Sequence, residues 1–108
     1  MLQELVVELK TLASTPANRP HMIPAGQTVP PGLVMFLDHP SSDVVLNALE
    51  TFYFLSLYPP NRTTMIENVY LMPKLKSLMS NGKTSDIKRK AIATFTSMKK
   101  AKVRLLRV

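Results

Sequence analysis

The chain has 108 residues, 45% of them apolar, and it contains no cysteine. This length and composition indicate one domain with a buried core, and disulfides, thiolate chemistry and cysteine-ligated metals are excluded. The chain contains no apolar run of the roughly 18 to 20 residues that a membrane-spanning helix requires. Its start, which includes Glu4 and Glu8, resembles neither a secretory signal nor an Arg-rich transit peptide.

The formal net charge is +7, and it is distributed unevenly along the chain. Residues 1–72 carry three Lys or Arg against six acids, net −3, whereas residues 73–108 carry eleven against Asp86 alone, net +10. A basic end favours an acidic protein, an anionic lipid or a nucleic acid as partner, although a merely solvated helix face is the alternative. The candidate contact residues are Lys88, Arg89, Lys90, Lys99, Lys100, Lys102, Arg104 and Arg107.

Apolar residues at helical spacing predict a first amphipathic helix over residues 2–14. Its apolar side comprises Leu2, Leu5, Val6, Leu9, Leu12 and Ala13. The following stretch to residue 32 is rich in proline, so that only a short helical turn near residues 19–23 is expected there. Pro31 then suits the first turn of a short helix over residues 33–37.

The densest apolar run predicts a long buried helix that ends before Pro59. We expect the side-chain oxygen of Ser41 or Ser42 to cap its start. Its inward residues are Val45, Ala48, Leu49, Phe52 and Leu55. Because the helix is apolar most of the way round, it belongs between two layers, and Ala48 should pack too closely against a neighbour to admit a large side chain.

Three further helices are predicted after the buried one. Residues 63–72 form a short helix, whose expected inward residues are Met65, Ile66, Val69 and Met72. Pro73 opens the next helix and Gly82 ends it as a C-terminal cap. Ser85 caps the last helix, whose inward stripe is Ile87, Ala91, Phe95 and Met98. The domain then spans residues 1–98, and residues 99–108 form a basic tail that extends this helix or hangs free.

An internal repeat organises these elements. A shift of 43 residues superimposes six identical pairs: Leu12 and Leu55, Pro16 and Pro59, Asn18 and Asn61, Arg19 and Arg62, Met22 and Met65, Ile23 and Ile66. After a one-residue deletion, Pro31 and Leu33 align with Pro73 and Leu75. The result is two units of short, medium and long helix, preceded by one helix of an earlier unit. We therefore predict an all-α fold, a short armadillo- or HEAT-like α-solenoid, rather than an irregular helical bundle.

At these residues the chain resembles the armadillo-repeat family. The segment NRTTMIENVYLMPKLKSLMSNGKTSDIKRKAIATF resembles one repeat, and ANRPHMI, PGLVMFLDHP and VVLNALETFYFL resemble the N-terminal domain of one branch. The resemblance implies a protein-binding adaptor, and that branch is associated with mitochondria and membrane-bridging assemblies. The resemblance also implies that an Asn ladder would bind extended peptides. The equivalent positions are Thr11, Phe54 and Ser97, and none of them is Asn. Binding of extended peptides through an Asn ladder is therefore not expected here.

The pairs Asn18 with Arg19 and Asn61 with Arg62 are expected to cap the short helices that follow them, with partner binding as the alternative. No residue pattern indicates a catalytic, cofactor or metal site, and His21 and His39 stand alone.

We therefore expect a non-enzymatic interaction module, an adaptor or accessory subunit of a larger assembly. It would be mitochondrial or otherwise cytoplasmic, with apolar ends covered by a protein partner. The alternative is a small basic RNA-associated subunit of an organellar ribonucleoprotein such as a mitoribosome.

Overall fold

The computed structural model describes residues 2–24 and 26–107, which form seven α-helices and two short 3-10 helices. In chain order these are α1 (Leu2–Ser14), η1 (Pro16–Asn18), α2 (Arg19–Met22), α3 (Pro31–Met35), η2 (Phe36–Asp38), α4 (Ser42–Ser56), α5 (Pro59–Glu67), α6 (Leu71–Asn81) and α7 (Ser85–Arg107). These residues contain no β-strand. The predicted all-α fold is confirmed.

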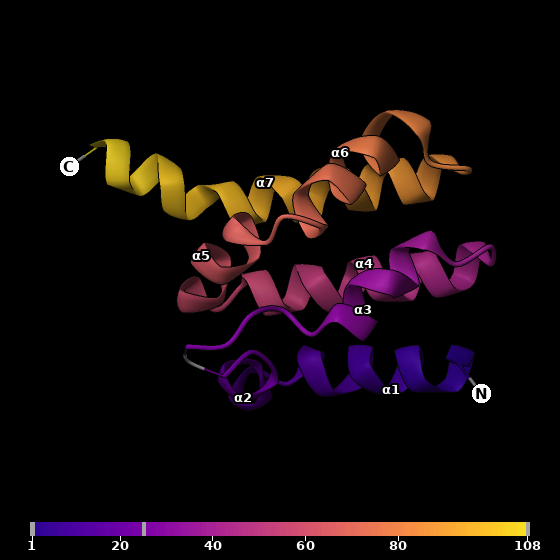
Figure 1. Cartoon of the computed structure of the whole chain (residues 1–108), viewed down its shortest axis with the longest axis horizontal. Coiled ribbons are helices and arrows are strands. Elements are labelled where there is room, and N and C mark those ends of the chain that lie inside the picture. Colours follow the sequence, from indigo (N-terminus) through magenta and orange to yellow (C-terminus); the bar gives the residue numbers. More distant parts are fainter. Residues whose placement is uncertain (1, 25, 108) are drawn as a thin grey trace.

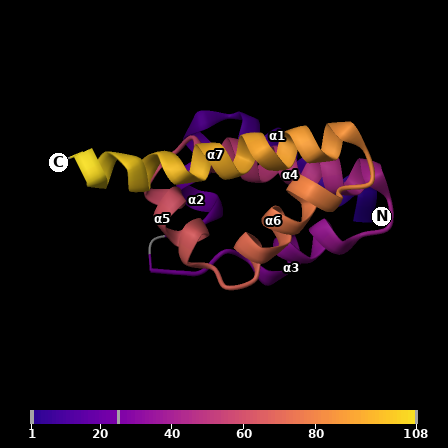
Figure 2. The same ribbon diagram turned by 90° about the horizontal axis from the view of Figure 1, so that it is seen from above.

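The three longest helices form a stack (Figure 1). They run in the same direction, and α4 lies in the middle, packed against both α1 and α7. Seen from above, α3, α5 and α6 all lie on one side of the stack (Figure 2). Each long helix after the first thus follows two shorter ones, as the 43-residue repeat predicts.

The core lies along α4. Ala48, Leu49, Phe52 and Leu55 are all completely buried, because α4 is covered by α1, η2, α5 and α7 together. The prediction of a helix between two layers, with Ala48 inside, is confirmed.

The predicted apolar side of α1 is only partly buried. Val6 and Ala13 are completely buried, whereas Leu5 is 46% and Leu12 50% exposed. The physical reason is that α4 covers one edge of this apolar side, while Leu5 and Leu12 on the other edge line an open groove. The side chain of Leu2 lies outside the described residues.

The chain between α4 and α6 differs from the prediction. The first helix there begins at Pro59, because two prolines in the first turn of a helix sacrifice no hydrogen bond. It ends at Glu67, and Val69, expected inside, is 73% exposed in the turn that follows. The side-chain oxygen of Asn68 accepts hydrogen bonds from the backbone N–H groups of Tyr70 and Leu71 and thereby starts α6.

Two predicted helix caps are also wrong. Ser41 does occupy the capping position of α4, but its side chain makes no capping hydrogen bond. At the start of α7 the hydroxyl of Thr84, not of Ser85, accepts from the N–H of Ile87 at 3.1 Å. Sequence alone does not decide between neighbouring hydroxyl residues, because the choice depends on which backbone turns into the helix.

Gly82 ends α6 as predicted, but its role is close packing. Its φ is −57°, outside the left-handed region. A Cβ atom at Gly82 would lie 2.7 Å from Cγ2 of Ile87 and 2.7 Å from the carbonyl oxygen of Leu78. The glycine therefore lets the chain reverse tightly between α6 and α7.

The backbone of α7 continues as one helix to Arg107. Of the two predicted alternatives for residues 99–108, extension of the last helix is the one observed through residue 107. The domain boundary between residues 98 and 99 stays a prediction, and it falls inside this helix.

Candidate functional site

The basic residues of α7 occupy two stripes on its outer side. Lys88 and Lys99 are eleven residues apart, as are Arg89 and Lys100, and eleven residues make about three helical turns. Each pair therefore lies along one line of the helix, and all four side chains are exposed. We call these four residues the basic face. The buried stripe opposite is Ile87, Ala91, Thr94, Ser97 and Met98.

The remaining predicted basic residues do not all join this face. Lys90 is exposed but lies toward α4, where its amine is 3.8 Å from a carboxylate oxygen of Glu50. Neighbouring residues of a helix point about 100° apart, so three consecutive basic residues cannot share one side. The side chains of Lys102, Arg104 and Arg107 lie outside the described residues, and their role stays a prediction.

Within the basic face, two side chains already have neighbours. Arg89 forms an ion pair with Asp86 one turn earlier, and the amine of Lys99 lies 4.8 Å from the centre of the Phe95 ring. Both contacts are at the surface, where such interactions contribute little free energy. The face therefore retains a net positive charge that is open to a partner.

The two Asn-Arg pairs share the same hydrogen-bond geometry, and this geometry differs from the predicted one. The side-chain amide of Asn18 donates to the carbonyl of Leu12 at 3.0 Å, and Asn61 donates to the carbonyl of Leu55 at 2.9 Å. Each residue thus reaches back to the end of the preceding long helix. The prediction that these residues cap the following short helices is wrong.

The arginines repeat the same pattern. The Nε group of Arg19 donates to the carbonyl of Ala13 at 2.8 Å, and that of Arg62 to the carbonyl of Ser56 at 2.6 Å. A cation here is favoured because the last carbonyls of a helix are unpaired and carry its negative dipole end. These side chains therefore serve as C-terminal caps that join one repeat to the next.

Burial separates the two pairs as candidates for partner binding. Asn61 and Arg62 are buried, and Asn61 also donates to the backbone carbonyl of Arg19 at 3.1 Å. Asn18 and Arg19 are half-buried, and the guanidinium of Arg19 lies over the Phe54 ring, 5.6 Å from its centre. The partner-binding role stays a prediction, and only the first pair retains access to solvent.

The three positions equivalent to an Asn ladder have other roles. Ser97 is buried and receives a hydrogen bond from the hydroxyl of Ser56 at 2.6 Å. Thr11 donates to the carbonyl of Val7 in its own helix. Together with Phe54 under Arg19, these side chains provide no ladder for the backbone of an extended peptide.

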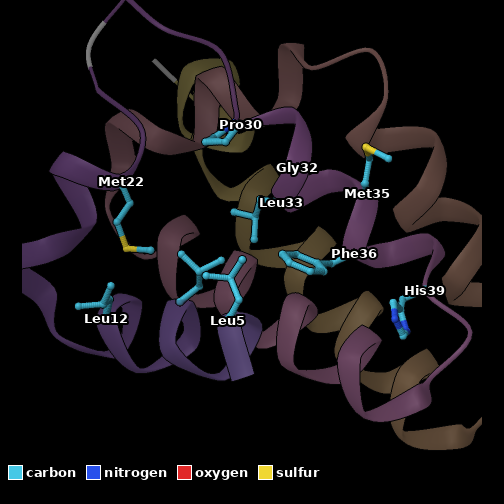
Figure 3. Close-up of a pocket in the computed structure, with 10 residues that line it drawn as sticks. Leu5, Leu12, Met22, Pro30, Gly32, Leu33, Met35, Phe36 and His39 are labelled. Carbon is cyan, nitrogen blue, oxygen red and sulfur yellow. The ribbon is translucent and has the colours of Figure 1, made fainter. Parts of the chain in front are cut away.

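An apolar groove lies between α1 and α3 (Figure 3), at an end of the stack where the sequence predicted an apolar surface. Its volume is about 700 Å³. Its lining comprises Leu5, Leu9, Leu12, Met22, Pro30, Gly32, Leu33, Met35, Phe36 and His39. Leu5, Leu33 and Phe36 gather around its middle, with Met22 and Leu12 toward one end and His39 at the other (Figure 3).

The groove and its surroundings show no chemistry beyond apolar contact. Nδ1 of His39 accepts a hydrogen bond from the backbone N–H of Ser41 at 3.0 Å, which stabilises the turn before α4. Among residues 2–24 and 26–107 there is no cluster of three or more His, Asp or Glu side chains that could hold a metal ion. Over the same residues, no helix combines the length and apolar character required to cross a membrane.

Comparisons with known proteins identify relatives of this chain by sequence identity. Over 80 residues, the chain is 36% identical to armadillo repeat-containing protein 1 of Gallus gallus and 34% identical to the proteins of that name from Bos taurus and Mus musculus. The match covers 74% of this chain and 28% of each relative. No family model matches the chain. No solved structure matches it either. Over these 80 residues the chain is thus a relative of armadillo repeat-containing protein 1, and the resemblance to armadillo repeats is confirmed.

Proposed function

We propose that this chain is a non-enzymatic protein-interaction module that acts as an adaptor or accessory subunit of a larger assembly, with the basic face of α7 as one contact surface. The observation that carries the proposal is the exposure of Lys88, Arg89, Lys99 and Lys100 on the outer side of the last helix. The relatives support the protein-binding role, because their name describes an armadillo-repeat protein, and such helical stacks present extended surfaces to partners.

The chemistry of the basic face favours an acidic protein. Four cations along about three helical turns create a local positive potential that steers an anionic surface into contact. Ile92, which lies between the two basic stripes and is 46% exposed, adds an apolar contact at the centre of the face. A central apolar residue with a charged rim is the usual composition of a protein interface.

Nucleic acid is the second candidate, and the +10 charge of residues 73–108 favours it. Recognition of single-stranded RNA relies on aromatic or guanidinium planes on which bases stack. Phe95 is half-buried beneath Lys99, so the described part of α7 lacks a free aromatic platform. This arrangement supports an acidic protein, rather than RNA, as the partner of the basic face.

The proposal is tested by charge reversal on the basic face. Lys88→Glu combined with Lys99→Glu changes one stripe without touching a buried residue, and Lys76→Glu, at an exposed position of α6, is the control. Each protein is used as bait in a native extract, with and without RNase. We expect the double variant to lose partners that the wild type and the control retain, with no effect of RNase.

Two results would contradict this proposal. Partners released by RNase would favour the ribonucleoprotein alternative, and their affinity should then fall steeply with salt concentration. Partners retained by the double variant would show that the basic face is only solvated.

The resemblance to a mitochondria-associated branch supports a mitochondrial assembly as the setting of this adaptor. Fractionation of cells that express the tagged chain tests this setting. Recovery outside the mitochondrial fraction would contradict it.

A further inference from the structure

The apolar groove between α1 and α3 lies apart from the basic face of α7, at the opposite end of the stack (Figure 1). We propose that this groove binds a basic amphipathic helix from a partner protein, whose apolar side covers the groove as α2 and η2 help to cover the equivalent surface of the next repeat. This inference is independent of the role proposed for the basic face.

The internal repeat shows the same surface in its covered form. Leu9, Leu12 and Met22 of the groove correspond to Phe52, Leu55 and Met65, because each pair is 43 residues apart. The three equivalents are all 0% exposed. The surface that forms an open groove in the first unit is therefore covered in the second unit.

The elements that fill this space are helical and come from the preceding unit. Helix α1, the 3-10 helix η2 and helix α2 all pack against α4, and α2 also packs against α5. Leu37 of η2 and Ile23, which follows α2, are both 4% exposed. The equivalent occupant of the groove is thus a helical segment with aliphatic side chains on one side.

The charges beside the groove specify the flanks of that helix. Glu4 and Glu8 are exposed on α1, next in sequence to the groove residues Leu5 and Leu9. The two cations of this region are already engaged: Lys10 pairs with Glu50 at 3.6 Å, and Arg19 donates to the carbonyls of Ala13 and Ser14. The rim is therefore acidic, and a helix with Lys or Arg beside its apolar side complements it.

A second copy of this chain is the competing occupant, because the equivalents of Leu37 and Ile23 in its last unit are the apolar residues Met79 and Ile66. Both are half-buried within their own unit, and Lys76 and Ser77 stand where the first unit has Val34 and Met35. The test therefore includes the oligomeric state of the chain.

The test uses a synthetic helical peptide of Leu and Lys, about 18 residues or five turns long, with all Leu on one side. Fluorescence anisotropy measures its binding to the full chain. A scrambled peptide of the same composition and a Leu/Glu peptide of the same pattern are the peptide controls. We expect the Leu/Lys peptide to bind more tightly than both.

The matched protein variants are Leu5→Gln with Leu12→Gln in the groove and Val7→Gln on the same helix, where Val7 is 43% exposed but does not line the groove. Burying two half-exposed leucines against a partner is worth about a tenfold change in Kd or more. We expect that weakening for the groove variant and none for Val7→Gln. In amide NMR spectra of the wild type, peptide-induced shifts should concentrate in α1, α2 and α3.

Several outcomes would overturn the proposal. The first is equal binding of the scrambled peptide, and the second is NMR shifts centred on α6 or α7. The third is a dimer of the wild type that the groove variant converts to monomer, because a second copy would then cover the groove. The NMR measurement needs no variant, so it locates the peptide-binding site even if the groove variant fails to fold.

Discussion

Replacing Asn61 with alanine tests the proposed link between the two repeats. Asn61 is 3% exposed, and its amide donates to the carbonyl of Leu55 at 2.9 Å and to that of Arg19 at 3.1 Å. The first bond caps α4, and the second joins the first unit to the second. Asn61→Ala removes both donors and leaves the two carbonyls without this partner.

Each lost hydrogen bond in a buried site costs about 1 kcal/mol. We therefore expect Asn61→Ala to lower the free energy of unfolding by about 2 kcal/mol, which corresponds to a fall in Tm of roughly 8 °C or more for a domain of this size. Asn18→Ala is the matched control, because Asn18 makes one equivalent bond, to Leu12 at 3.0 Å, in a half-exposed setting. It should cost about 1 kcal/mol or less.

Urea denaturation followed by circular dichroism at the helical minimum measures both variants. Asn61→Ala and Asn18→Ala are identical changes at equivalent repeat positions, so the difference between their losses of stability measures the second hydrogen bond of Asn61. Equal losses at the two positions, or a loss at Asn61 below that at Asn18, would refute the bridging role of Asn61.

The remaining predictions concern single positions and are all measured by thermal unfolding. Ala48→Arg should abolish folding, because Ala48 is completely buried and the charge would have no partner; an unchanged Tm would contradict the position of α4. Gly82→Ala should destabilise the chain, because the new Cβ would lie 2.7 Å from Cγ2 of Ile87. Thr84→Ala should cost about 1 kcal/mol and Ser85→Ala much less, since only the Thr84 hydroxyl caps α7; the reverse order would restore Ser85 as the cap.

The fold was predictable because the repeat and the helical periodicity agree. The identical residues 43 apart placed the helices in equivalent positions, and the apolar run around Ala48 identified the central layer. Details at helix ends were harder to predict. Asn18 and Asn61 lie between two helices, and sequence does not show that their amides reach back rather than forward. Val69 has helical spacing from Met65, but the two prolines start α5 earlier and Asn68 ends it.

The candidate surfaces were predictable only in part. The basic end is visible in composition, but helical geometry directs Lys90 to Glu50 and leaves Lys88, Arg89, Lys99 and Lys100 as the exposed basic face. To predict the groove, one needs the relative positions of α1 and α3. The periodicity within a single helix gives no information about them. One signal was present in the sequence: Leu9 and Leu12 correspond to the core residues Phe52 and Leu55 of α4. Because residues at core positions of one repeat are also apolar in the other, the surface of α1 that carries Leu9 and Leu12 is expected to be covered by another element.

The measurement that tests the adaptor role most directly is crosslinking in native extract with a carbodiimide, which joins lysine amines to carboxylates in direct contact. Mass spectrometry then identifies the joined peptides, and a nuclease-treated sample is compared. We predict that Lys88, Lys99 or Lys100 becomes joined to Asp or Glu residues of one recurring partner protein, in both samples. Recovery of these lysines joined to no protein, with the chain sedimenting in an RNase-sensitive particle, would contradict the account.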